Sequence, residues 1–86
     1  MTSRQYRLLG FLGTEQATDT EVLSHDLCWS YYSTVMCLLA CRRRGWIVRG
    51  EAIESYRLTQ AGRGAREARR RRISTYIQAS LTCRDG

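Results

Sequence analysis

One stretch constrains this chain more than any other, the fourteen residues 35–48 with the sequence "VMCLLACRRRGWIV". Seven apolar or small residues lead into three arginines and a glycine, and a second apolar run follows. Ser30 is a favoured N-cap residue, terminal arginines complement the negative end of a helix dipole, and glycine commonly follows a helix in the left-handed conformation. These features predict a helix from Tyr31 to about Arg44 that ends at Gly45.

The flanking segments predict the order helix, helix, helix, strand, strand, helix. A short helix is expected within residues 4–12, and a second from Thr20 to about Leu27 with Asp19 as its N-cap. After the glycine, "WIVRG" and "SYRLT" are typical of two strands joined by a hairpin. A final helix is expected over residues 60–81. We therefore predict a single domain over residues 1–86, mostly α-helical with a small β-hairpin.

The charge of the chain is unevenly distributed. All fourteen basic residues are arginines, and the formal net charge is +6. Residues 1–41 hold two arginines and four acids, whereas residues 42–86 hold twelve arginines and four acids. A basic half of this kind favours a polyanionic partner, and nucleic acid is the commonest one.

Several classes of protein are disfavoured by the sequence. No apolar run approaches the ~20 residues that span a bilayer, and the start lacks the layout of a signal peptide, so we expect a cytoplasmic protein without a membrane partner. One histidine, eight acids and no catalytic motif indicate a protein that is not an enzyme and uses no cofactor. The four cysteines are expected to be reduced. A zinc or redox site built from His25, Cys28, Cys37 and Cys41 is a minor alternative, because the spacing matches no compact zinc signature.

Three pieces of the sequence together resemble the winged-helix branch of helix-turn-helix proteins, as found in small prokaryotic transcriptional regulators. They are "TDTEVLSHDLCWS", the helix that leads into "RRRGWIVR", and the joint "YRLTQAGR" between strand and helix. The resemblance covers residues 4–68. It implies a three-helix core, a two-stranded wing and a C-terminal helix, with the third helix in the major groove of DNA.

The resemblance also implies which residues contact DNA. Early positions of the third helix would face bases or nearby phosphates, the arginines at its end would contact the backbone, and the wing arginines would grip phosphates. The expected nucleic-acid-binding residues are Tyr32, Ser33, Met36, Arg42, Arg43, Arg44, Arg49, Arg57 and Arg63.

Two features depart from the family pattern. Cys28 stands in the turn between the second and third helices, where the family usually has glycine. The segment 35–41 is apolar on every side, whereas a base-reading helix normally exposes polar groups. The family alignment places Thr34, Cys37, Leu38 and Cys41 inward, and apolar bulk alone places Val35, Leu38 and Leu39 inward; the sequence leaves both open.

The C-terminal helix carries an apolar stripe of its own. Its members are Ile73, Tyr76, Ile77 and Leu81. The stripe can pack back on the first helix or pair with a second copy of the chain, and we favour a homodimer. Its arginine run, residues 69–72, adds to the expected nucleic-acid surface.

These observations lead to one hypothesis and two rivals. The leading one is sequence-specific binding of double-stranded DNA by a small repressor-like regulator of a bacterium, phage or mobile element. An excisionase-like protein that bends DNA is a close relative of this hypothesis. The rival from another class is a protein-binding module, such as a phage inhibitor of a host nucleic-acid machine, whose apolar third helix docks on a host protein.

Overall fold

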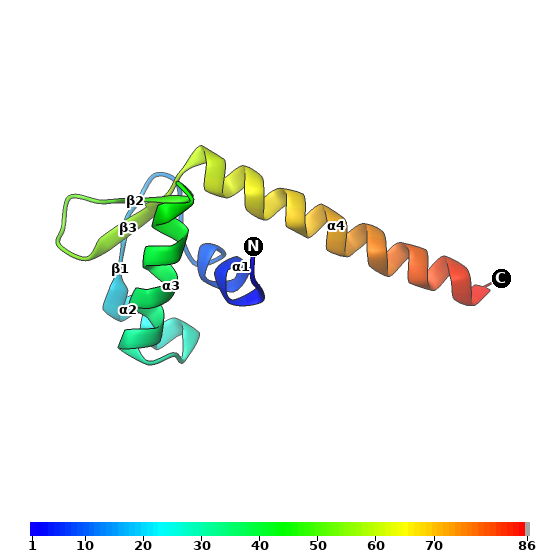
Figure 1. The fold of residues 1–86 in the computed structure, drawn as a ribbon, viewed down its shortest axis with the longest axis horizontal. Helices are drawn as coiled ribbons and strands as arrows, with labels where there is room; N and C mark the ends of the chain where they lie inside the picture. The colour runs from blue at the N-terminus through cyan, green and yellow to red at the C-terminus, as the bar shows by residue number, and fades with distance from the viewer. Residues whose placement is uncertain (86) are drawn as a thin grey trace.

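The computed structural model describes the backbone of residues 1–85 and the side chains of residues 1–75. Four helices and three short strands follow one another along the chain (Figure 1). Their bounds are α1 Ser3–Leu9, β1 Thr18–Asp19, α2 Thr20–Leu27, α3 Tyr31–Arg43, β2 Ile47–Arg49, β3 Ser55–Leu58 and α4 Gln60–Asp85. The expected helices and hairpin are all present. No helix in this part of the chain has the length and apolar character needed to cross a membrane.

The sheet contains one strand that the sequence did not predict. Strands β2 and β3 form the expected antiparallel hairpin, with Ile47 opposite Leu58. Strand β1 pairs with the other edge of β3 and places Asp19 opposite Ser55. A two-residue strand has too few residues for an alternating pattern, so residues 18 and 19 read as a loop in the sequence.

The start of α2 is held differently from our prediction. Asp19 is extended and precedes the helix, but its side chain accepts no capping hydrogen bond. Instead, the main-chain oxygen of Glu54 accepts hydrogen bonds from the Thr20 N–H at 3.0 Å and from the Thr20 hydroxyl at 2.7 Å. Asp19 is therefore the N-cap residue of α2, as expected, but the expected capping by its side chain is wrong, because a carbonyl from the hairpin satisfies the first amide of α2.

The core is built from leucines on three helices and apolar residues of the hairpin. On α3, Thr34, Leu38 and Cys41 are buried, whereas Leu39 remains 39% exposed. The inward set from the family alignment is thus confirmed for these three positions, with Cys37 partly buried. The set based on apolar bulk is wrong for Leu39, because residues at spacings of three and four share one helix face. The buried apolar residues are Leu8, Leu9, Leu12, Leu23, Leu27, Leu38, Cys41, Ile47 and Leu58.

The turn between α2 and α3 keeps the shape that glycine usually provides. Cys28 has φ 58° and ψ 34°, in the left-handed region, and ends α2. The Trp29 N–H then donates to the Ser24 oxygen at 3.0 Å. A non-glycine residue in this conformation costs roughly 1–2 kcal/mol of stability. Cysteine at position 28 therefore lowers the stability of the turn, while the turn keeps its left-handed geometry.

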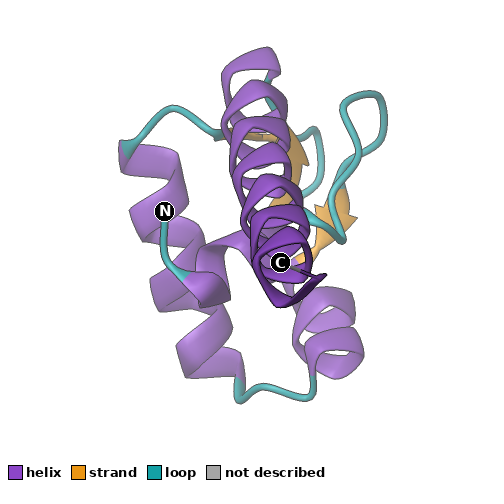
Figure 2. Ribbon diagram, turned by 90° about the vertical axis from the view of Figure 1, so that its right-hand side faces the viewer, coloured by secondary structure: helices purple, strands orange, loops and turns teal. Residues whose placement is uncertain are grey.

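Helix α4 leaves the body as a long rod. Its 26 residues correspond to roughly 39 Å at ~1.5 Å per residue, and it extends beyond the expected end at residue 81. Thr59 starts it, because its hydroxyl accepts a hydrogen bond from the Gly62 N–H at 3.0 Å. The first turns lie against the body and the C-terminal half projects away from it (Figure 1). Figure 2 looks toward the C-terminal end of this rod.

Candidate nucleic-acid interface

The outer face of α3 is open and mainly apolar. The exposed fractions are 73% for Tyr32, 48% for Met36 and 39% for Leu39. Ser33 is half-buried, and its hydroxyl and main-chain N–H both contact the Ser30 hydroxyl oxygen, at 2.9 and 3.1 Å. Of the residues expected to face bases, Tyr32 and Met36 are therefore available, whereas Ser33 takes part in the N-cap.

The arginine triplet ends α3 on its solvent side. Arg42, Arg43 and Arg44 are all exposed, and none of them forms an ion pair within the described part of the chain. The Arg44 guanidinium lies 5.7 Å from the centre of the Trp46 ring, at a distance typical of a cation–π contact. Three unneutralised guanidinium groups next to an exposed helix face can bind an anionic backbone.

The two wing arginines point to opposite faces of the hairpin. Arg49 pairs with Tyr56, and Arg57 pairs with Val48 one position further along the ladder. Because consecutive strand residues alternate between faces, Arg49 and Arg57 cannot belong to one surface. Arg57 donates a hydrogen bond of 3.5 Å to the Thr14 oxygen, on the loop that precedes β1. Among the described residues, the Arg49 side chain forms no hydrogen bond with that loop.

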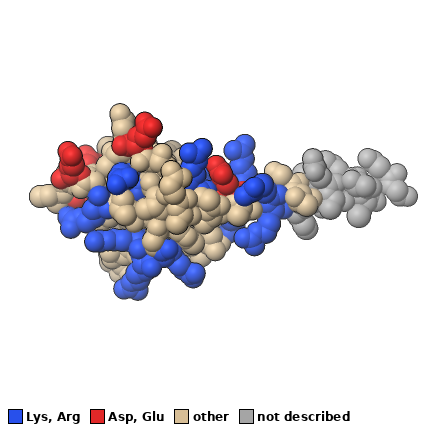
Figure 3. Space-filling model, turned by 90° about the horizontal axis from the view of Figure 1, so that it is seen from above, with Lys and Arg blue, Asp and Glu red and all other residues tan. Residues whose placement is uncertain are grey.

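The tip of the wing is acidic and apolar, a feature that was not predicted from the sequence. Its residues 50–54 have the sequence "GEAIE", and Ile53 is 83% exposed. Seen from above, the acidic residues of the body gather along one edge, whereas arginines cover the opposite edge and the start of α4 (Figure 3). The signal was present in the sequence as two glutamates in the expected hairpin turn.

Glu54 ties the wing to both helices of the helix-turn-helix unit. It has a left-handed backbone with φ 60°, and its main-chain oxygen accepts from Thr20 at the start of α2. Its carboxylate accepts a hydrogen bond from the hydroxyl of Tyr31, the first residue of α3. This hydrogen bond raises the pKa of Tyr31 to about 12, and the negative charge of Glu54 adds to the effect.

Arg63 lies apart from α3. It closes the first turn of α4 and forms an ion pair with Glu67 at 3.3 Å. Together with Leu9 and Gly13 it lines a pocket between α1 and α4. The structure therefore separates Arg63 from the other expected DNA-binding residues.

A shallow groove of about 350 Å³ separates the first turn of α1 from the start of α3. Arg4 lines it opposite Tyr32 and Met36, and its guanidinium lies 4.7 Å from the centre of the Trp29 ring. Arg4 was not among the residues expected from the sequence, because the N-terminal half is acidic as a whole. This arginine extends the positive charge next to α3.

Cys37 lines this groove, and the buried Cys41 lies one helical turn further along α3. A hydrogen bond from Cys41 lowers the pKa of the Cys37 thiol, and the charge of Arg4 acts in the same direction. The same hydrogen bond, together with burial, raises the pKa of Cys41. Cys37 therefore has the greater thiolate character of the two.

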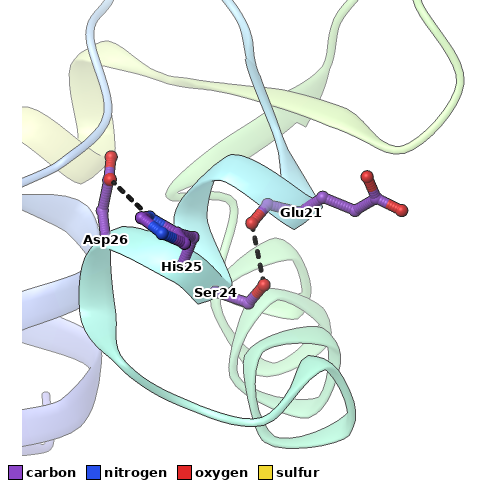
Figure 4. A network of polar contacts seen from close by, with 4 residues as sticks. All are labelled: Glu21, Ser24, His25 and Asp26. Carbon is purple, nitrogen blue, oxygen red and sulfur yellow. Dashed lines mark hydrogen bonds and ion pairs between the residues drawn. The ribbon is translucent and has the colours of Figure 1, made fainter.

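Ser24 and His25 of α2 interact with neighbouring residues of the same helix (Figure 4). The Ser24 hydroxyl donates to the Glu21 oxygen at 2.8 Å, and His25 Nδ1 lies 3.6 Å from an Asp26 carboxylate oxygen. The His25 side chain is 92% exposed. Among the described residues, no three His, Cys, Asp or Glu side chains come close enough to hold a metal ion.

Of the residues expected to form the dimerisation stripe of α4, only Ile73 belongs to those whose side chains are described. Ile73 is 41% exposed and lines a groove of about 450 Å³ with Met1, Trp46 and Ala68. The side chains of Tyr76, Ile77 and Leu81 lie outside the described residues. Near the body, Arg66 and Arg69 of α4 lie over the Tyr6 ring of α1, at 4.7 and 5.7 Å from its centre.

The arginine run of α4 is divided between two roles. Arg69 donates hydrogen bonds to the Met1 oxygen and to the Ser3 hydroxyl, so it joins α4 to the start of the chain. Arg70, Arg71 and Arg72 are exposed. The expected basic surface therefore does not extend over all of residues 69–72, and its exposed part consists of Arg70, Arg71 and Arg72.

Comparison with known proteins identifies the fold. No protein-family model and no curated protein matches the chain. Among solved structures, the chain is similar to MepR, a transcription regulator of the Staphylococcus aureus multidrug efflux pump MepA, with a TM-score of 0.81, 19% identity and coverage of 95% of this chain and 64% of MepR. It is also similar to Streptococcus pneumoniae FabT in complex with DNA, with a TM-score of 0.69, 17% identity and coverage of 94% and 60%. The chain has the winged-helix fold, as the sequence resemblance predicted, and spans about three-fifths of the length of these proteins.

Proposed function

We propose that this chain binds double-stranded DNA as a transcription regulator, with α3 as its recognition helix. The observation that carries the proposal is the arginine triplet, which is exposed, free of ion pairs among the described residues and located at the end of an open helix. The likeness to MepR and to FabT, which was solved in complex with DNA, supports it. An α-helix fits the major groove, and guanidinium groups bind phosphates.

The proposed contacts follow from where each side chain lies. Tyr32 and Met36 contact base edges or thymine methyl groups, and Arg42, Arg43 and Arg44 bind the backbone. Arg49 contacts phosphate from the wing. Ser33 and Arg57 act indirectly, through the N-cap of α3 and through the loop before β1.

We further propose that residues 1–86 act as one winged-helix unit and that α4 pairs two copies. Ile73 is exposed on the rod, and the sequence continues its stripe with Tyr76, Ile77 and Leu81. Two-fold symmetry then matches an inverted repeat in the DNA. A repressor-like role in a bacterium, phage or mobile element is the finer form of this proposal.

Binding to a labelled duplex library from the chain's own genomic neighbourhood tests the proposal. Fluorescence anisotropy at low salt should show binding by the natural chain and at least ~100-fold weaker binding by R42A/R43A/R44A, since each phosphate contact contributes strongly at low salt. The matched control is R70A/R71A/R72A, which removes the same charge from α4. Equal loss in both variants would indicate non-specific electrostatics and would contradict the assignment to α3.

A second candidate function is favoured by the apolar face of α3. Tyr32, Met36 and Leu39 are exposed together on the helix that would face the partner. Large exposed apolar side chains at one surface are typical of a protein-binding site. If α3 docks on a protein, Met36→Asp abolishes partner binding, and the triple arginine variant leaves it largely intact.

A further inference from the structure

We propose that the pocket between α1 and α4 binds a small oxyanion, a phosphate or carboxylate group. The pocket has a volume of about 260 Å³ and lies at the junction of α1, the loop that follows it and the first turns of α4. Thr14, Arg63, Arg66 and Glu67 form its polar lining, and Leu9 and Leu58 contribute apolar surface. None of these residues belongs to the outer face of α3.

Arg66 provides the first argument. Its guanidinium lies 4.7 Å from the centre of the Tyr6 ring and packs against Gly10, where an added Cβ would be 2.9 Å from Nη2. These contacts restrain the side chain. Its Nε is buried and has no hydrogen-bond partner among the described residues. A buried cationic donor without an acceptor is unfavourable. Arg66 also lines the adjoining pocket, so an anion there supplies an acceptor once the side chain turns its Nε toward the pocket.

Arg63 provides a second guanidinium at the same pocket. It precedes Arg66 by three residues on α4 and is held by Glu67, whose carboxylate lies 3.3 Å from its Nε. Glu67 lines the pocket as well, so the lining residues carry two positive charges and one negative charge. The planar fork of arginine matches the geometry of carboxylate and phosphate oxygens.

The loop after α1 lines the pocket with Gly13 and Thr14. The Gly13 oxygen accepts from the Leu58 N–H at 2.8 Å, and the Thr14 oxygen accepts from Arg57. These bonds hold the loop in place through its carbonyl groups. Within the part of the chain that is described, the Gly13 and Thr14 amides donate no hydrogen bond. Successive free amides in a turn commonly form part of an anion site.

Nuclear magnetic resonance on the full ¹⁵N-labelled chain tests the proposal. Sodium phosphate, and in a separate titration sodium malonate, is added while sodium chloride is lowered so that ionic strength stays constant. We expect saturable shifts of the Gly13 and Thr14 amides and of the Arg66 Nε–H resonance with at least one of the two anions. The anion that saturates identifies the group, phosphate or carboxylate.

Variants locate the binding and keep the test decisive. R63M and R66M should weaken the saturable response at least tenfold, whereas R70M, which removes an exposed arginine from the same helix, should leave it unchanged. If R66M does not fold, R63M decides, because the Arg63 side chain is 57% exposed. No saturation with either anion, or equal responses in R63M and R70M, would overturn the proposal and assign the Arg66 site to water. The titration contains no DNA, so its outcome is independent of the proposed function.

Discussion

At the scale of single residues, two glycines of α4 differ in whether a side chain could be added at their position. An added Cβ at Gly62 would lie 2.2 Å from the Trp46 oxygen and 2.9 Å from a Leu58 methyl carbon, so only glycine lets α4 start this close to the hairpin. At Gly64, two residues on, an added Cβ meets nothing within 4 Å. The first glycine is therefore required by packing, and the second only weakens the helix.

This contrast gives a matched pair of variants. Gly62→Ala should lower the free energy of unfolding by about 2–3 kcal/mol, because backbone must move to relieve the overlap. Gly64→Ala should raise it by about 0.5–1 kcal/mol, the usual advantage of alanine over glycine within a helix. Urea unfolding at one protein concentration measures both. Equal effects of the two changes would contradict the close approach at Gly62.

Individual residues also show the limits of sequence reasoning. Ser30 and Gly45 mark the ends of α3 through local rules, and both act as expected. Glu54 contacts Tyr31, which is 23 positions away in the sequence, and Thr20, which is 34 positions away. No local sequence pattern reveals such contacts. Cys28 adopts a conformation that glycine favours, and only the surrounding fold determines this.

At the scale of elements, the contact between Tyr31 and Glu54 joins the wing to α3. The raised pKa of Tyr31 means that folding favours the protonated phenol. The corresponding stability is fully present below the unfolded pKa of ~10 and is lost as the pH rises through about 12. In an ultraviolet absorbance titration, the difference between the natural chain and Tyr31→Phe should contain one step near pH 12.

The Glu54→Gln variant provides the control for this titration. It removes the negative charge and the strong acceptor together, so the Tyr31 step should move to lower pH. A Tyr31 step that is the same with and without the Glu54 carboxylate would show that the two elements are not joined through this hydrogen bond.

The acidic wing tip leads to a separate prediction about affinity. If the hairpin approaches DNA, Glu51 repels the phosphates, because like charges within a Debye length raise the energy of the complex. Glu51→Gln should tighten DNA binding by about two- to fivefold at low salt. Asp26→Asn removes one negative charge near the end of α2 and should have a smaller effect. Weaker binding by Glu51→Gln would indicate that the glutamate contacts DNA directly.

Element order was predictable because each helix and hairpin strand carries its own periodicity and end signals. Strand β1 was not predictable, because its two residues pair through the backbone and leave little trace in the side-chain pattern. The same holds for the candidate site. The arginine triplet was evident from the sequence, whereas the opposite facing of Arg49 and Arg57 follows only from strand register.

At the scale of the whole molecule, the long α4 gives the chain extents of 54 × 26 × 19 Å. A projecting helix with an exposed Ile73 is the element that we propose to join two copies. Ile73→Asp should shift sedimentation at micromolar concentration from dimer to monomer, because a buried charge at a helix pair is strongly unfavourable. Ser74→Asp, at an adjacent exposed position, is the control. A monomeric natural chain would contradict the proposed pairing.

The salt dependence of DNA binding tests the central claim most directly. The affinity of the natural chain for its best duplex is measured between 50 and 200 mM salt, a range in which several phosphate contacts change affinity by roughly 10³-fold or more. The slope of log affinity against log salt should become shallower by about 2–3 in R42A/R43A/R44A, at ~0.9 per lost phosphate contact. It should change much less in R70A/R71A/R72A. An unchanged slope in the first variant, or no binding by the natural chain at the lowest salt, would contradict a DNA-binding role for α3 and its arginines.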